Sequence, residues 1–132
     1  MRQFFFFLTL AFCGTAFAAE TPMSGAEFDA YATGRTLTYA ESGVIYGIEE
    51  YLPNRRVRWA FTEDECREGY WYEDGAAICF VYEDNPVAQC WTFTHGSRGL
   101  IAKFLGSDNG RELYEAQQSD DPLVCLGPDV GV

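Results

Sequence analysis

Four cysteines are the residues of this sequence with the most specific chemistry. Cys66, Cys79, Cys90 and Cys125 can form two disulfides, or they can bind a metal ion as four thiolates. Structural zinc sites usually contain short C-x-x-C pairs, whereas 12, 10 and 34 residues separate the successive cysteines here. The spacing therefore predicts two disulfides, no metal site and no redox-active thiol pair. We also expect no cofactor.

Acid–base or nucleophilic catalysis would have to use His95, the single histidine, or a pair among the twenty Asp and Glu residues. No nucleophile motif accompanies His95, so we predict no catalytic residue and no enzyme. Glu50 is the carboxylate of most interest, because the expected register places it on the inner side of a sheet, where it needs a partner. Arg55, Arg98, His95 or a tyrosine hydroxyl would supply one, and the favoured alternative is a rim position in water. We therefore assign Glu50, Arg55, His95 and Arg98 to a polar rim.

The charge of the chain argues against nucleic acid as a partner. Its 132 residues include nine Lys plus Arg against twenty Asp plus Glu, for a formal charge of −11. Binding to phosphate backbones or to anionic membranes depends on clustered basic residues, and the few in this chain are scattered. The length fits a single domain with its own core.

The first 18 residues have the composition of a secretory signal. Arg2 precedes an apolar run from Phe4 to Phe12, and the small-residue pattern Ala16-Phe17-Ala18 follows. We predict cleavage after Ala18, with a retained N-terminal anchor as the alternative. No later stretch approaches the ~20 apolar residues of a membrane span. Residues 19–132 are therefore expected to form one soluble domain, periplasmic or secreted, in which paired cysteines are oxidised.

The mature sequence is expected to begin with a short helix and to continue as strands. Ser24 and Glu27 form a capping box for a helix over about Gly25 to Ala32, with Phe28 and Tyr31 on its buried side. Further along, polarity alternates with period two between regularly spaced turn signals, which is typical of an all-β barrel or sandwich. The eight expected strands are about Thr36 to Glu41, Val44 to Leu52, Arg55 to Phe61, Arg67 to Glu73, Ala76 to Tyr82, Val87 to His95, Leu100 to Leu105 and Glu112 to Gln117.

Short turns between these strands determine which residues face each other. The two-residue hairpin turns that we expect are Ser42-Gly43, Pro53-Asn54 and Asp74-Gly75. In the resulting register Cys79 lies opposite Cys90, which predicts that these two form one disulfide and that Cys66 and Cys125 form the other. The further predicted pairs are Leu37 with Ile48, Tyr39 with Tyr46, Ile48 with Trp59, Tyr46 with Phe61, Trp71 with Ile78, Gly69 with Phe80, Ala76 with Phe93 and Trp91 with Phe104.

The large side chains of these pairs share one face of the sheet, which must be buried. We predict an all-β, eight-stranded antiparallel up-and-down barrel closed at one end by the N-terminal helix, with a two-sheet sandwich as the alternative. Gly69, opposite Trp59, is expected to leave room for the indole. The predicted inner residues are Leu37, Tyr39, Tyr46, Ile48, Val57, Trp59, Phe61, Trp71, Ile78, Phe80, Trp91, Phe93 and Phe104. Those assigned to line a ligand cavity are Tyr39, Tyr46, Trp59, Trp71, Phe80, Trp91 and Phe93.

Four motifs occur between about Thr36 and Phe93, namely Tyr46-Gly47-Ile48-Glu49-Glu50-Tyr51-Leu52-Pro53-Asn54, Gly69-Tyr70-Trp71, Ile78-Cys79-Phe80 and Cys90-Trp91. These G-x-W, I-C-F and C-W strands resemble those of small exported bacterial proteins in an uncharacterised domain-of-unknown-function family. Where that family often has Gly after Asn or Asp, Arg55 follows Asn54 here. The resemblance implies the architecture and export, and the family carries no established activity. The chain also resembles lipocalin-type barrels in strand count and in its G-x-W, which lies mid-chain rather than on the first strand.

Alternate connections of a meander lie at alternate ends of a barrel, so the two ends are expected to differ in charge. One end gathers Glu41, Glu63, Asp64, Glu65, Glu83, Asp84 and Asp108, and the other gathers Arg55, Arg56, His95 and Arg98. The acidic rim is read first as a solvated surface, and second as a site for a cation or a basic protein partner. The inward aromatic residues either fill the barrel or line a ligand cavity. We therefore expect an exported, non-catalytic binding module, and the alternatives are a lipocalin-like carrier of a small apolar ligand and a protein-binding inhibitor.

Overall fold

The computed structural model describes residues 13–14, 21–61, 65–106 and 110–125. The predicted signal segment lies outside these residues except for Cys13 and Gly14. Three of the acidic loop residues named above, Glu63, Asp64 and Asp108, also lie outside them. The statements that follow concern the described residues.

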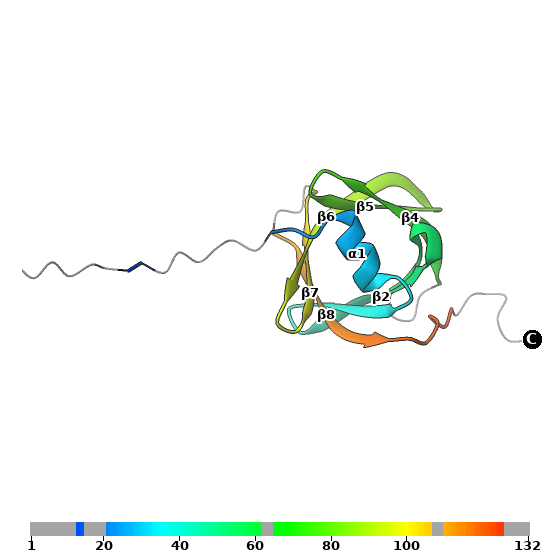
Figure 1. Ribbon diagram of the computed structural model, residues 1–132. Coiled ribbons are helices and arrows are strands. Elements are labelled where there is room, and N and C mark those ends of the chain that lie inside the picture. The colour runs from blue at the N-terminus through cyan, green and yellow to red at the C-terminus, as the bar shows by residue number, and fades with distance from the viewer. Residues whose placement is uncertain (1–12, 15–20, 62–64, 107–109, 126–132) are drawn as a thin grey trace, which may run out of the picture.

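In this part of the chain, eight antiparallel strands in sequence order close into a barrel (Figure 1). Each strand pairs with the next, and β8 pairs with β1 to complete the ring. The predicted all-β up-and-down barrel with a short N-terminal helix is confirmed, and the sandwich alternative is wrong. The strands are β1 (Thr36–Glu41), β2 (Val44–Leu52), β3 (Arg56–Ala60), β4 (Arg67–Asp74), β5 (Ala77–Tyr82), β6 (Asn85–Gly96), β7 (Gly99–Phe104) and β8 (Glu112–Ser119).

Helix α1 (Gly25–Ala32) lies inside the ring of strands, as Figure 1 shows. Ser24 Oγ accepts a hydrogen bond from the Glu27 amide at 3.1 Å, which is the predicted N-terminal cap. The chain leaves the helix at Gly34, whose φ of 88° favours glycine. Neither α1 nor another helix in the described ranges is long and apolar enough to cross a membrane.

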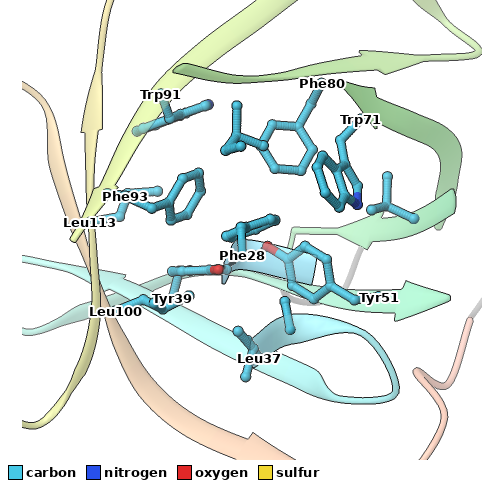
Figure 2. Close-up of a cluster of buried hydrophobic side chains, with 14 of the residues drawn as sticks. Phe28, Leu37, Tyr39, Tyr51, Trp71, Phe80, Trp91, Phe93, Leu100 and Leu113 are labelled. Carbon is cyan, nitrogen blue, oxygen red and sulfur yellow. Dashed lines mark hydrogen bonds between the residues drawn. The ribbon is translucent and has the colours of Figure 1, made fainter. Parts of the chain in front are cut away.

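Phe28 joins α1 to the barrel core. Its side chain is fully buried, and its ring lies 5.5 Å from Tyr51, 5.1 Å from Trp71 and 4.5 Å from Phe93 (Figure 2). The Met23 amide also donates to the Phe93 carbonyl at 2.7 Å, which ties the start of the helix to β6. Because these partners lie toward the end that carries the β2–β3, β4–β5 and β6–β7 turns, α1 fills this end of the barrel and leaves the other end to side chains alone.

A β-bulge in β2 overturns the register predicted between β1 and β2. Ala40 pairs with Ile45 beside the turn, but Tyr39 pairs with Gly47, so Tyr46 is an extra residue in β2. A bulge keeps two successive side chains on one side and reverses the alternation beyond it. The predicted pairs Leu37–Ile48 and Tyr39–Tyr46 are therefore wrong. Beyond the bulge, Glu49 and Tyr51 face the interior, and Ile48 and Glu50 face outward.

The turn between β2 and β3 is one residue longer than predicted. Leu52 pairs with Arg56, so the turn is Pro53–Arg55 rather than Pro53-Asn54. This turn places Glu49 rather than Ile48 opposite Trp59, and the bulge is what turns Glu49 inward. Trp59 still faces inward as predicted, because the two one-residue shifts compensate on β3. Phe61 lies beyond the end of β3, although its ring remains 5.6 Å from that of Tyr46.

The turn between β4 and β5 consists of Gly75 and Ala76, because Asp74 pairs with Ala77. This shift changes partners without changing faces, since it moves the pairing by an even number of residues. Ala76 consequently lies outside β5 and does not pair with Phe93 as predicted. The corrected pairs are Trp71 with Phe80 instead of Ile78, and Gly69 with Tyr82 instead of Phe80.

Gly47, and not Gly69, makes room for the indole of Trp59. A Cβ atom on Gly47 would collide with the six-membered ring of Trp59 and would lie 2.9 Å from the Ala60 carbonyl oxygen. Gly69 instead pairs with Val57 on β3. The predicted role of Gly69 beside Trp59 is wrong, because Arg67 is the partner of Trp59 on β4.

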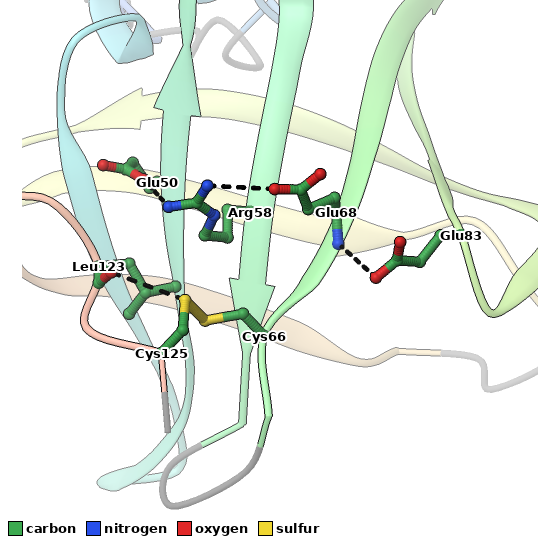
Figure 3. The surroundings of a disulfide bond; sticks show 7 residues. All are labelled: Glu50, Arg58, Cys66, Glu68, Glu83, Leu123 and Cys125. Carbon is green, nitrogen blue, oxygen red and sulfur yellow. Dashed lines mark hydrogen bonds and ion pairs between the residues drawn. A yellow bond between two sulfur atoms is a disulfide. The ribbon is translucent and has the colours of Figure 1, made fainter. Parts of the chain in front are cut away.

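Both predicted disulfides are confirmed. Cys79 and Cys90 are register partners on β5 and β6, with their Cα atoms 4.0 Å apart. Cys66 and Cys125 join the start of β4 to the segment after β8, with their Cα atoms 5.3 Å apart (Figure 3). On the chain-entropy model, loops of these lengths stabilise the fold by ~3 and ~4 kcal/mol. The predicted pair Trp91–Phe104 is also confirmed.

Candidate ligand-binding site

A cavity of about 210 Å³ occupies the end of the barrel opposite α1. Its deep residues include Tyr51, Phe80 and Phe93, the same rings that surround Phe28 of the helix. Residues at the acidic end form its mouth, where Phe61 is 37% exposed. The lining residues are Tyr39, Tyr46, Glu49, Tyr51, Trp59, Phe61, Arg67, Phe80, Tyr82, Asp84, Asn85, Gln89, Trp91, Phe93, Ala102 and Leu113.

Most of the residues predicted to line a ligand cavity do surround this space. They are Tyr39, Tyr46, Trp59, Phe80, Trp91 and Phe93. Trp71 does not, because its ring packs 5.1 Å from Phe28 of α1 and lies 4.5 Å below the guanidinium carbon of Arg55. The helix thus occupies the part of the interior next to Trp71. That these residues bind a ligand stays a prediction.

The four residues assigned to a polar rim do not meet at the cavity. Glu50 is buried on the outer wall, 8% exposed, and forms an ion pair with Arg58 at 3.5 Å (Figure 3). Its expected positions, on the inner side of the sheet or in water at the rim, are therefore wrong. Arg55, His95 and Arg98 lie at the α1 end: Arg55 covers Trp71, the exposed His95 ring is 5.0 Å from Tyr31, and the exposed Arg98 is in the β6–β7 turn.

Glu49 is a buried polar residue of the cavity that the sequence analysis does not predict. Its side chain is 2% exposed, and Tyr82 Oη donates a hydrogen bond to Glu49 Oε2 at 2.6 Å. Burial raises the pKa of Glu49 from 4.5 to about 8, although the hydroxyls of Tyr82 and Tyr51 act in the opposite direction. The carboxyl group of Glu49 is therefore largely protonated at neutral pH.

The adjacent acids Glu49 and Glu50 carry a signal that could have identified this carboxyl. Neighbouring residues of a strand point to opposite faces, so one of the two must face the interior in either register. Alternation alone selects Glu50, and only the bulge at Tyr46 changes the choice to Glu49. A bulge has no single-residue signature strong enough to locate it here.

Tyrosine hydroxyls extend the polar group around Glu49. Tyr39 and Tyr51 share a hydrogen bond of 2.8 Å between their hydroxyls, which point toward each other in Figure 2. Burial raises the pKa of Tyr39, of Tyr51 and of Tyr82 well above 10, and the charge of Glu49 raises it further. These tyrosines remain neutral across the physiological range and act as hydrogen-bond donors and acceptors.

A second buried acid, Glu115, differs from Glu49 because it does not line the cavity and is held by hydrogen bonds within the protein. It accepts hydrogen bonds from Tyr31 Oη at 2.7 Å, from the Leu100 amide at 2.8 Å and from Gln118 Nε2 at 3.0 Å. Burial and the hydrogen bond from Tyr31 to Glu115 raise the pKa of Tyr31 to about 12. Glu115 thus ties α1 to β7 and β8 and has a structural role.

The basic residues at the mouth are each paired with an acid. Arg67 Nε lies 2.5 Å from Asp84 Oδ2. Arg111 Nε lies 3.7 Å from Glu41 Oε2, and its Nη1 donates to Tyr46 Oη at 3.1 Å. No Lys, Arg or His in residues 21–61, 65–106 and 110–125 forms an ion pair with Glu49. Among the described residues, Glu49 is therefore the lining carboxyl group that has no basic partner.

Comparisons of this chain with protein-family models, with curated proteins and with solved structures find no match.

Proposed function

We propose that this protein is an exported, non-catalytic binding module that holds a small, largely aromatic molecule in the open end of its barrel. The observation that carries this proposal is the aromatic cavity opposite α1. A barrel of this size either fills with side chains or encloses one small ligand. Here the helix fills one end, and the other end keeps an unfilled space.

The volume indicates the size of the ligand. An apolar cavity of ~150 Å³ binds benzene, and cavities for drug-sized ligands are usually ~300 Å³ or larger. The 210 Å³ measured here fits one aromatic ring with a few attached atoms. Because the lining combines rings with a carboxyl and several hydroxyls, we expect a ligand that is apolar over most of its surface with one polar group.

Export is supported by two independent features. The disulfides Cys66–Cys125 and Cys79–Cys90 are stable in oxidising compartments, and Met1–Ala18 has the pattern of a secretory signal. We therefore propose a periplasmic or secreted location, in which the barrel acts as a carrier or sensor rather than as an enzyme.

The three tryptophans provide a test of the binding site. Trp59 and Trp91 line the cavity, whereas Trp71 packs against α1 and lies outside it. The variant Trp71→Phe keeps the reporters at the site, and the double variant Trp59→Phe/Trp91→Phe keeps only the remote one. Titration with a panel of single-ring compounds should change the fluorescence of the first variant and leave that of the second unchanged.

A cavity-filling variant tests the same site without relying on the reporter. Ala102 is buried on the cavity wall, so Ala102→Leu should fill part of the space and weaken binding at least tenfold without lowering the melting temperature. The proposal is wrong if no compound of this size binds, or if binding persists unchanged in Ala102→Leu.

A further inference from the structure

The cavity combines one unpaired carboxyl with a surrounding set of aromatic faces. Glu49 is 2% exposed and receives a hydrogen bond from Tyr82, but no cationic side chain of the described residues pairs with it. A buried carboxylate is costly unless a counter-charge is present. An occupant of the cavity that carries a positive charge would supply what the protein does not.

The rings near Glu49 favour the same class of occupant. Trp59 is the register partner of Glu49, and Tyr46 lies 5.8 Å from Trp59 between ring centroids. The rings of Phe61 and Trp91 also line the space. Aromatic faces attract cations through their quadrupoles, and the attraction grows when the site excludes water. Rings in this arrangement suit the apolar surface of an alkylated ammonium group, and an adjacent carboxylate is the group that can balance its charge.

We infer that the ligand of this barrel is a small organic cation, held with its charged nitrogen between Glu49 and the rings around Trp59. This inference rests on the proposed function, because it assigns the chemical class of the molecule bound in the cavity. An anion is disfavoured, since it would lie beside Glu49, and the basic residues that the structure describes at the mouth, Arg67 and Arg111, are paired with acids.

The outer surface supports entry of a cation through the acidic end. The chain has a formal charge of −11, and the exposed Glu65, Glu83 and Asp84 lie on the connections at the mouth. Such a field raises the local concentration of cations and speeds their association, an effect that weakens with salt. Arg67 and Arg111 do not oppose it, because Asp84 and Glu41 neutralise them.

The protonation of Glu49 makes the inference sensitive to pH. The titratable groups around this carboxyl are Tyr39, Tyr46, Tyr51 and Tyr82, with the Arg67–Asp84 ion pair at the mouth. The carboxyl must lose its proton before it can balance a cation. Because the pKa of Glu49 is about 8, the affinity for a permanent cation falls roughly tenfold for each pH unit below this value and levels off above it.

The decisive experiment compares two molecules of equal shape and different charge. Phenyltrimethylammonium carries a permanent positive charge, and tert-butylbenzene is its neutral isostere. We expect the cation to bind at least tenfold more tightly at pH 9, where Glu49 is ionised. Dissociation constants can be measured from the tryptophan fluorescence of the wild type, with competition as a check.

Two neighbouring substitutions separate the role of the cavity carboxyl from that of general charge. Glu49→Gln removes the charge inside the cavity, and Glu50→Gln removes the same charge from the outer wall, where Glu50 pairs with Arg58. We expect Glu49→Gln to bind both molecules equally and to lose the pH dependence. Glu50→Gln should keep the preference for the cation and the pH dependence.

Each result distinguishes the inference from the function on which it rests. If the isosteres bind equally to the wild type at pH 9, the cavity is a binding site but the cation assignment is wrong. If neither binds at millimolar concentration, the proposed binding site itself is wrong. If Glu49→Gln does not fold, the pH dependence of cation binding in the wild type still decides: an affinity that is constant between pH 6 and pH 9 overturns the inference.

Discussion

The buried carboxyl of Glu49 should make this protein less stable as the pH rises, which is the reverse of the usual effect of a carboxylate. In the folded barrel the pKa of Glu49 is about 8, whereas in the unfolded chain it returns to the ordinary value of 4.5. Between these values the unfolded chain has released the proton and the folded chain still holds it. Because the folded state then binds more protons, the free energy of unfolding falls with rising pH.

The size of the effect follows from the two pKa values. One pKa unit corresponds to about 1.4 kcal/mol, so the difference between 4.5 and about 8 sets an upper limit of roughly 5 kcal/mol. Relaxation around a buried carboxylate lowers such limits in real proteins. We therefore expect a loss of about 2 to 3 kcal/mol between pH 5 and pH 9 from this group alone. The stabilising effect is fully present below pH 4.5 and is lost as the pH passes through 8.

Urea unfolding at pH 5, 7 and 9, followed by tryptophan fluorescence with the disulfides intact, measures this loss in the wild type and in Glu49→Gln. The variant should match the wild type within about 1 kcal/mol at pH 5, where both side chains are neutral. At pH 9 the variant should be the more stable of the two by about 2 to 3 kcal/mol. The tyrosines with raised pKa values stay neutral in this range and do not contribute.

Glu50→Gln is the matched control, because this neighbouring carboxylate faces the outer wall and pairs with Arg58. It should leave the pH dependence of the wild type in place. If the wild type and Glu49→Gln lose stability equally between pH 5 and pH 9, Glu49 is not the group that titrates. The assignment of a protonated carboxyl inside the cavity would then be refuted.

Three further variants test the packing. Phe28→Ala should lower the free energy of unfolding, measured in urea, by about 3 to 5 kcal/mol, because the ring is fully buried between α1 and the barrel. A loss below about 1 kcal/mol would mean that the helix is not docked in the barrel. Cys66→Ala/Cys125→Ala should lower the free energy of unfolding by about 4 kcal/mol, and an unchanged stability after reduction of the wild type would contradict the long-loop pairing. Gly47→Ala should lower the free energy of unfolding by about 1 to 3 kcal/mol and shift the tryptophan emission, because the added methyl group collides with Trp59. A variant with wild-type stability and emission would show that residue 47 and Trp59 are not in contact.

The sequence predicts the barrel well because its strongest signals are short-range. Asp and Gly residues mark most of the hairpin turns. An error of an even number of residues in the pairing of two strands leaves the assignment of side chains to the inner and outer faces unchanged. The β4–β5 turn shows this: Trp71 meets Phe80 rather than Ile78, and both stay inside. The pairing of Cys79 with Cys90 rests on a single hairpin and is correct for the same reason.

The candidate site is less predictable because it depends on the exceptions to alternation. The extra residue Tyr46 reverses the alternation of β2, and the three-residue turn Pro53–Arg55 shifts the pairing of β3 with β2 by one position. Glu49 faces the interior because of the bulge, and the longer turn then keeps Trp59 inside. Tertiary contacts, such as the fit of Gly47 against Trp59, stabilise them, and such contacts are invisible to patterns within one strand.

The position of α1 has a consequence for the way in which this protein assembles. A segment of eight residues is too short to stay helical in water on its own, so α1 needs the rings around Phe28 to be in place first. Those rings come from strands as distant as β6, and β1 begins only a few residues after the helix. The segment of α1 is therefore synthesised early, but it becomes helical only when the later strands supply their rings. We therefore expect that α1 docks in the same cooperative step in which β1 pairs with β8.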